Sequence, residues 1–180
     1  MKTKSLILLL LVVVSFFTSC KDEKKAAAIE AETVTEKPFT VTVHAVVAQD
    51  DIFQIFYNED GTETFTPEQA ITIQVKGNSN PQDLVFALPE EIMPTSLRFD
   101  IGGNKEQKEV ALKGFKIDYY SKSLSAKGAD FMKYFYGNTQ VEFDTLKVVA
   151  KIKLLDGEPY DPILGSTTAL KLELAKLYKK

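Results

Sequence analysis

The stretch FTVTVHAVV, residues 39–47, sets the expected fold class of this chain. Its apolar side chains recur at every second position from Phe39 to Val47, and threonine or histidine occupies most positions between them. Successive side chains of a β-strand point to opposite faces, so this period of two predicts a strand with one buried face. His44 belongs to the polar set, and we therefore expect it to be exposed on the outer face of that strand.

Apolar residues alternate in several other segments, each of which predicts a strand. One of these, 52–57, has aromatic or β-branched residues on both faces, which indicates a strand covered on each side. The expected strands are 39–47, 52–57, 71–75, 84–88, 97–101, 110–119 and 146–154, with polar loops at 77–82 and 155–165. Many short strands with little helix predict an antiparallel two-sheet β-sandwich instead of alternating βαβ units.

Local signals refine this fold. The segment TPEQ, residues 66–69, has the spacing of a capping box with proline at the first helical position, and predicts one helical turn. Gly114 separates two registers of apolar residues within 110–119, which indicates a β-bulge or a bend. A short helix is expected at 129–136. From Thr168 onward leucines alternate as in a strand, but the abundance of Ala, Leu, Glu and Lys favours a C-terminal helix.

Length and composition restrict the organisation and the partners of the chain. Residues 38–180 suffice for one domain and are too few for two. The formal net charge is −3, which gives no electrostatic reason for binding nucleic acid or anionic lipid. Arg98 is the only arginine, so a bidentate guanidinium contact is restricted to one position. Cys20 is the only cysteine, and no disulfide is expected.

The first twenty residues have the order of a secretory signal. Lys2 and Lys4 precede an apolar segment, 6–17, in which only Ser15 is polar. Small residues follow it directly before Cys20. A transmembrane helix needs about 20 apolar residues to cross the hydrocarbon core. This segment is therefore too short to span a bilayer.

The sequence Phe17-Thr18-Ser19-Cys20 resembles the lipobox of bacterial lipoproteins. The resemblance implies that residues 1–19 are a signal peptide and that Cys20 carries fatty acyl chains such as palmitate, which hold the protein in the outer membrane. A plain cleaved signal or an uncleaved anchor is the alternative. The next residues, Lys21–Lys25, are similar to the tag that sends some lipoproteins to the cell surface, with periplasm-facing retention as the alternative. We expect residues 20–37, the acylated cysteine with a charged, alanine-rich segment, to be a flexible tether.

The segment 52–119 resembles galactose-binding-like jelly-roll modules. The resemblance rests on its paired apolar strands, on Pro89, which ends the strand 84–88, and on Leu97–Asp100 before a glycine turn. The resemblance implies a jelly-roll-like sandwich that binds carbohydrate at one rim or on a concave sheet. It also implies a structural calcium, for which the sequence itself gives no support. Aromatic rings stack on sugars and charged groups hydrogen-bond to them. The candidate ligand-binding residues are accordingly Tyr57, Arg98, Asp100, Tyr119 and Tyr120, and the alternative is that the tyrosines pack in the core and the charged pair lies on a solvated strand face.

No catalytic motif is present in the sequence. His44 has no partnered serine or cysteine motif, and Glu90 and Glu91 are merely adjacent in an expected loop. The segment 58–62 lacks the acid spacing of an EF-hand and indicates a turn. We expect a protein that is not an enzyme and has no metal or other cofactor. Two hypotheses follow: a surface lipoprotein that binds carbohydrate, or a structural envelope lipoprotein that binds another protein.

Overall fold

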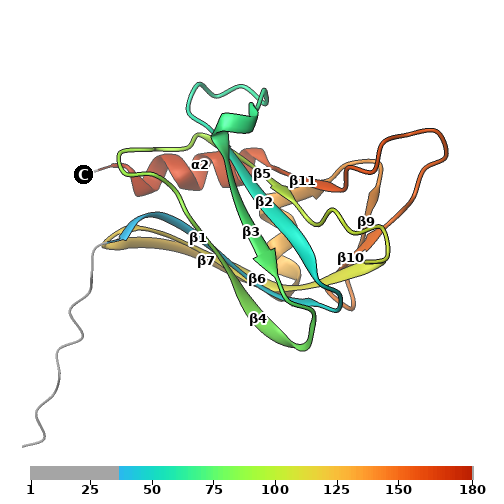
Figure 1. Cartoon of the computed structure of the whole chain (residues 1–180). Helices are drawn as coiled ribbons and strands as arrows, with labels where there is room; N and C mark the ends of the chain where they lie inside the picture. The colour runs from blue at the N-terminus through green and yellow to red at the C-terminus, as the bar shows by residue number, and fades with distance from the viewer. Residues whose placement is uncertain (1–36, 180) are drawn as a thin grey trace, which may run out of the picture. The chain divides into compact units, whose positions relative to one another are not determined.

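Strand β1 lies near the middle of the larger of two antiparallel sheets in the computed structural model, which describes residues 37–179 (Figure 1). The six-stranded sheet has the order β4-β1-β6-β10-β9, and β7 also pairs with β6. The five-stranded sheet has the order β3-β2-β5-β11-β8. The strands are β1 (Lys37–Val47), β2 (Asp51–Asn58), β3 (Ala70–Val75), β4 (Asn78–Ala87), β5 (Ser96–Asp100), β6 (Glu109–Tyr120), β7 (Lys122–Lys127), β8 (Phe135–Gly137), β9 (Val141–Asp144), β10 (Val149–Ile152) and β11 (Ile163–Ser166).

The core lies between the two sheets, as the predicted sandwich requires. The alternating apolar residues of β1, from Phe39 to Val47, have no exposed surface. Aromatic side chains join the sheets, because the ring of Phe99 on β5 lies 5.8 Å from that of Phe86 on β4. His44 is exposed on the opposite face of β1, as predicted. The antiparallel two-sheet β-sandwich is thus confirmed.

Helix α2 (Thr168–Leu177) confirms the predicted C-terminal helix. It begins where Thr167 Oγ1 accepts a hydrogen bond from the backbone N–H of Leu170 at 3.3 Å, an N-cap contact. Leu170, Leu174 and Leu177 are buried, whereas Leu172 is 60% exposed. The helix contacts β7 of one sheet and β11 of the other, so it closes one side of the sandwich (Figure 1).

The two other helical predictions are also met, with one change of boundary. Pro67–Gln69 forms the single 3₁₀ turn η1, and Gln69 Oε1 accepts from the N–H of Thr66 at 3.2 Å. The predicted helix at 129–136 is present as the 3₁₀ turn η2 (Gly128–Asp130) and α1 (Phe131–Tyr134). Its last two residues are in β8 instead, where Phe135 is buried against the core.

Strand β6 has the predicted irregularity at Gly114. His44 pairs with Gly114 but Ala45 pairs with Leu112, so Lys113 is the extra residue of a β-bulge. The bulge restores the register, and the apolar residues on both sides of it face the core. The glycine is required by a close approach: a Cβ at Gly114 would lie 2.6 Å from the carbonyl oxygen of Ala126 on β7.

The predicted strand at 146–154 is present only at its centre, Val149–Ile152, and its two ends are wrong. This segment contains a turn, followed by the short strand β10, which pairs with β9. Leu146 is 95% exposed and Val148 has a positive φ of 56°. The turn forms because Asp144 Oδ1 accepts the backbone N–H of Lys147 at 3.1 Å, a local bond that alternation cannot reveal. Lys151 and Lys153 would protect an edge strand from further pairing, but β9 and not β10 is the outer strand.

Two other boundaries and the burial of one strand also differ from the expectation. The polar segment 78–82 is the start of β4 and not a loop, because β4 is an edge strand on which polar residues and Pro81 are tolerated. Strand β2 is covered on one face only: Ile52 on its other face is 49% exposed. The end of the expected loop 155–165 belongs to β11. Strands β7, β8 and β9 were not predicted.

Candidate functional site

The five residues that the sequence proposed for ligand binding lie in three separate places. Tyr57 is 7% exposed and points into the core. Arg98 and Asp100 lie on the outer face of the five-stranded sheet, on β5. Tyr119 and Tyr120 lie at the end of β6 in the other sheet. Only the charged pair occupies a surface on which a binding site can be built from neighbouring strands.

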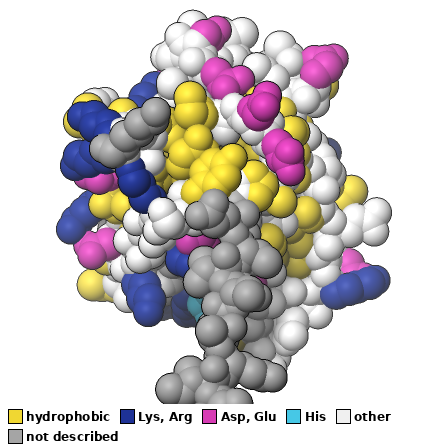
Figure 2. Space-filling model, turned by 90° about the vertical axis from the view of Figure 1, so that its left-hand side faces the viewer, with side chains coloured by type: hydrophobic (Ala, Val, Ile, Leu, Met, Phe, Trp, Pro, Cys, Tyr) yellow, Lys and Arg dark blue, Asp and Glu magenta, His cyan; other side chains and the backbone are white. Residues whose placement is uncertain are grey.

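The two tyrosines belong to an aromatic cluster that closes one end of the sandwich. The ring of Tyr119 lies 4.8 Å from that of Tyr120 and 5.0 Å from that of Tyr178 at the end of α2. The Tyr178 hydroxyl donates to the carbonyl of Pro94 at 2.7 Å, and burial raises the pKa of Tyr178 above its ordinary value. Tyr120 is 44% exposed, as is Met93. Figure 2 shows hydrophobic side chains gathered at this end of the molecule.

The outer face of the five-stranded sheet carries its side chains in two rows that run across the strands. We call this surface the platform. In the first row Arg98 pairs with Phe56 of β2 on one side and with Gly165 of β11 on the other, and Gly165 pairs with Tyr136 of β8. In the second row Asp100 pairs with Gln54 and with Ile163. The platform consists of Phe56, Arg98, Gly165, Tyr136, Gln54, Asp100, Ile163 and Thr72, which pairs with Gln54.

Arg98 and Asp100, two residues apart on β5, form a bidentate ion pair. The guanidinium donates from Nε to Oδ1 at 2.8 Å and from Nη2 to Oδ2 at 2.7 Å. Asp161 approaches Nη2 at 3.7 Å, and the Arg98 Cζ atom lies 4.5 Å from the centre of the Phe56 ring. The two side chains of the pair are only 25% and 15% exposed. The pair is therefore held rigidly in a partly dehydrated position.

Burial and the attraction between the two charges have opposite effects on the pKa of each side chain. Burial raises the pKa of Asp100 above the ordinary value, although the hydrogen bonds from Arg98 pull the same pKa down. Hydrogen bonding to Asp100 raises the pKa of Arg98 in turn. The desolvation of a partly buried ion pair can exceed its Coulombic gain. The pair therefore contributes little to the stability of the sheet, and its presence is better explained by another role.

A ring next to Arg98 completes the first row. Tyr136 lies against Gly165, where a Cβ atom would approach the ring to 2.5 Å. The Tyr136 hydroxyl donates to Glu63 Oε2 at 3.1 Å, and Glu63 pairs with Lys171 of α2 at 2.7 Å. Arg98, Tyr136 and Glu63 line a depression of about 150 Å³. Tyr136 is 46% exposed, so its ring is accessible to a ligand.

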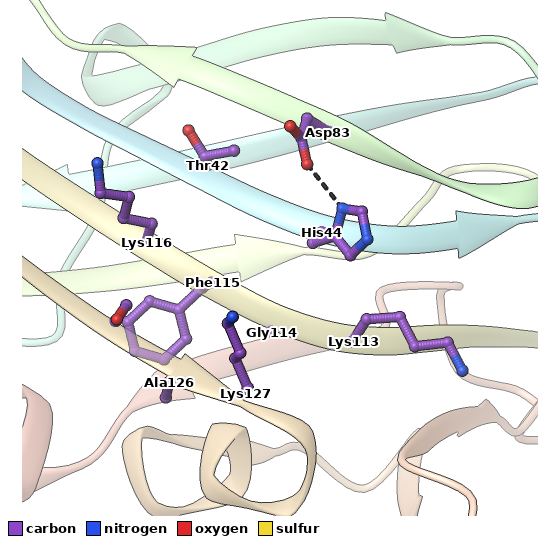
Figure 3. Close-up of a pocket in the computed structure, with 10 residues that line it drawn as sticks. Thr42, His44, Asp83, Lys113, Gly114, Phe115, Lys116, Ala126 and Lys127 are labelled. Carbon is purple, nitrogen blue, oxygen red and sulfur yellow. Dashed lines mark hydrogen bonds and ion pairs between the residues drawn. The ribbon is translucent and has the colours of Figure 1, made fainter.

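The outer face of the six-stranded sheet has a larger hollow, of about 580 Å³ (Figure 3). His44 Nδ1 lies 2.7 Å from Asp83 Oδ1 at its rim. Ser125 also lines the hollow but is on β7, two strands from His44, and no hydrogen bond connects them in the described chain. A nucleophile activated by histidine is therefore not assembled here.

Other chemistries find little support in residues 37–179. No group of three or more His, Cys, Asp or Glu side chains there could hold a metal ion. The segment 58–62 instead forms the predicted turn after β2. Asn58 stabilises this turn, because its Oδ1 accepts the N–H groups of Asp60 and Gly61 at 2.9 and 3.1 Å. Within the described part of the chain, no helix is long and apolar enough to cross a membrane. Cys20 lies outside the described residues, and its acylation stays a prediction.

Comparison of the chain with protein-family models, with curated proteins and with solved structures found no match. The fold and the surfaces therefore define the class by themselves. The protein contains an antiparallel β-sandwich with a polar and aromatic platform on one outer face and a hollow on the other. Neighbouring side chains of the platform come from strands that are far apart in the sequence. Only the proximity of Arg98 and Asp100, which lie on one strand, could therefore be predicted from the sequence.

Proposed function

We propose that this protein is a lipid-anchored envelope protein whose β-sandwich binds carbohydrate on the platform without catalysing a reaction. The observation that carries the proposal is the partly buried Arg98–Asp100 pair, which lies between the Phe56 and Tyr136 positions of one row. A fixed ion pair near the accessible ring of Tyr136 offers both kinds of contact that a sugar makes. Hydroxyl groups hydrogen-bond to the charges, and C–H faces pack on the rings.

The second row extends the polar part of this surface. Gln54 Nε2 donates to Thr72 Oγ1 at 2.9 Å, which leaves the amide oxygen of Gln54 as an acceptor beside Asp100. Arg98 uses two of its N–H groups for Asp100, and a guanidinium has five in all. A ligand that lies across β2, β5, β11 and β8 would thus meet donors, acceptors and the ring of Tyr136 in fixed positions, which reduces the entropy lost on binding.

The double substitution Arg98→Met with Asp100→Leu separates a binding role from a structural one. Replacing a buried ion pair by apolar residues of similar volume is often neutral for stability. We therefore expect the free energy of unfolding to change by less than about 1 kcal/mol, while carbohydrate binding falls at least tenfold. The measurement is a glycan array followed by calorimetric titration of the hits, made on the compact unit from Thr35 to Lys180.

A charge-matched control is available on the other sheet. Lys116 and Asp118 have the same spacing on β6 and form a 2.7 Å ion pair on its outer face. The variant Lys116→Met with Asp118→Leu should keep the affinity for the neutral glycan hits. The proposal is rejected if the parent binds no glycan, or if both double variants lose binding equally. It is also rejected if the Arg98 and Asp100 variant unfolds, since the pair would then be structural.

The anchoring at Cys20 is tested separately. Both resemblances that support it, the lipobox and the surface-export tag, lie in residues 17–25, outside the described structure. We expect the mature N-terminal peptide to carry acyl chains on Cys20, and Cys20→Ser to move the protein to the aqueous fraction. Mass spectrometry and cell fractionation measure these outcomes. Protease treatment of whole cells distinguishes surface exposure from periplasm-facing attachment, and an unmodified Cys20 would contradict the anchor.

An alternative function is binding to another envelope protein. It is favoured by the exposed hydrophobic side chains at the end of the sandwich where Tyr120 and Met93 are each 44% exposed (Figure 2). Such a partner would co-purify with the protein and would be released by Tyr120→Ser or Met93→Ser. The platform variant would leave that complex intact, which distinguishes the two functions.

A further inference from the structure

The hollow on the six-stranded sheet lies over one row of residues that crosses four strands. Asp83, His44, Gly114 and Lys127 form one row across β4, β1, β6 and β7. Gly114 contributes no side chain to this row, and the side chain of Lys127 lies close to it. On the other sheet the corresponding glycine, Gly165, is covered by the ring of Tyr136. Gly114 is approached just as closely, by the backbone of β7, and the residues of its row line a hollow of about 580 Å³.

The charges around this hollow are mainly positive. Lys113, Lys116 and Lys127 line it together with Asp83. Lys116 is engaged by Asp118, whereas Lys113 and Lys127 make no ion pair within residues 37–179. In Figure 3 the side chain of Lys127 rises over the strand at Gly114, toward His44. This local excess of cations stands out in a chain whose net charge is −3.

His44 and the hydroxyl groups complete the lining. Asp83 Oδ1 lies 2.7 Å from Nδ1 of His44 and orients the imidazole, which leaves the second ring nitrogen for another partner. Thr42 and Ser125 line the same space from β1 and β7. The floor is the backbone of β6 at the bulge, a rigid element held on both sides by neighbouring strands. Cations at the rim and hydroxyl groups below them suit a ligand that is both anionic and polyhydroxylated.

We propose that this hollow is a second binding site, separate from the platform, for an acidic saccharide. One of its carboxylate or sulfate groups pairs with Lys127 and another with Lys113, and its hydroxyl groups bond to Thr42, Ser125 and His44. The volume lies within the 300–1,000 Å³ typical of small-molecule sites, so one or two sugar rings fit. The proposal does not depend on the platform, because the two surfaces lie on different sheets.

Calorimetric titration of the compact unit tests this inference with four probes: a sulfated tetrasaccharide, an oligogalacturonate, neutral maltotetraose and inorganic phosphate. We expect binding of at least one of the two acidic saccharides and none of maltotetraose at the hollow. Lys127→Gln should weaken that binding at least fivefold. Added salt should weaken it as well, since ion pairing contributes to it. The platform variant Arg98→Met with Asp100→Leu should leave it unchanged.

Lys147→Gln is the matched control. It removes the same charge as Lys127→Gln, but Lys147 lies in the exposed turn between β9 and β10. It should not change the affinity. Equal weakening by Lys147→Gln and Lys127→Gln would overturn the proposal in favour of nonspecific attraction. Phosphate that binds as tightly as either saccharide would overturn the saccharide assignment. Absence of binding by both acidic saccharides would overturn the site itself.

Discussion

Asp51→Ala should lower the free energy of unfolding by about 3 kcal/mol, since each buried donor that loses its acceptor costs about 1–3 kcal/mol. Asp51 is 8% exposed, and its Oδ1 accepts three backbone N–H groups. These belong to Ile52 at 2.7 Å, Gly103 at 2.8 Å and Asn104 at 2.9 Å. The last two lie in the connection between β5 and β6, so this carboxylate joins the two sheets at one end. Alanine would leave these donors without a partner.

The neighbouring Asp50 provides the control. It is exposed, pairs with Lys76 at 2.5 Å and accepts from the N–H of Gly77 at 2.9 Å. Exposed ion pairs contribute little, so Asp50→Ala should destabilise the fold much less than Asp51→Ala. Urea denaturation followed by circular dichroism measures both variants. Equal losses for Asp50→Ala and Asp51→Ala, or no loss for Asp51→Ala, would show that the carboxylate does not hold the connection.

Gly114→Ala should lower the free energy of unfolding by about 2 kcal/mol, within the 1–3 kcal/mol typical of overpacking. The new Cβ would lie 2.6 Å from the carbonyl oxygen of Ala126 and 3.2 Å from the Cα atom of Lys127. Both are backbone atoms of β7, so the clash is relieved only if β6 and β7 move apart. The φ angle of Gly114 is not among the positive ones. The expected loss is therefore steric, and Gly114→Val should be at least as unfavourable.

Gly103→Ala is the matched control for this prediction. Gly103 also lacks a positive φ, and a Cβ there would meet its nearest atom, Asp51 Oδ1, at 4.0 Å. We expect the midpoint of denaturation to be unchanged within the usual ±0.5 kcal/mol or so of surface substitutions. If Gly103→Ala and Gly114→Ala were equally unfavourable, the loss would reflect glycine replacement in general, and the close approach of β6 to β7 would be disproved.

The sequence predicted the elements whose signal is local and long. The alternation of β1 and the leucines of α2 at 170, 174 and 177 are such signals, and both elements are present. The bulge at Gly114 was also predictable, because a change of apolar register along one strand requires it. These features depend on burial of one face, which composition and period report directly.

The predictions that failed depend on hydrogen bonds or on position in the sheet. The alternation from Leu146 to Leu154 continues through a turn that Asp144 stabilises by bonding to the Lys147 N–H. The polar residues 78–82 form a strand because β4 lies at an edge. Short strands such as β8, with three residues, carry too little pattern to be recognised. None of these signals is a matter of local hydrophobicity.

The same distinction applies to the candidate site. Arg98 and Asp100 are two residues apart on one strand, so their contact followed from period alone. Their neighbours Phe56 and Tyr136 join them only through the pairing of β5 with β2 and, by way of β11, with β8. Such pairing is set by the whole sheet, and no short segment reports it. Tyr57 is not part of the platform, because its side chain faces the core, as its odd-numbered neighbours Phe53 and Ile55 do.

The central claim is that the platform is a carbohydrate-binding surface, and NMR mapping tests it most directly. The amide spectrum of the unit from Thr35 to Lys180 is followed during titration with the best neutral glycan from the array. We predict that the shifts concentrate on β2, β5, β11 and β8, including the Arg98 side-chain Nε–H, and spare β1 and β6. Shifts confined to the other sheet or to the end of the sandwich at Tyr120, or no shifts at saturating glycan, would contradict the claim.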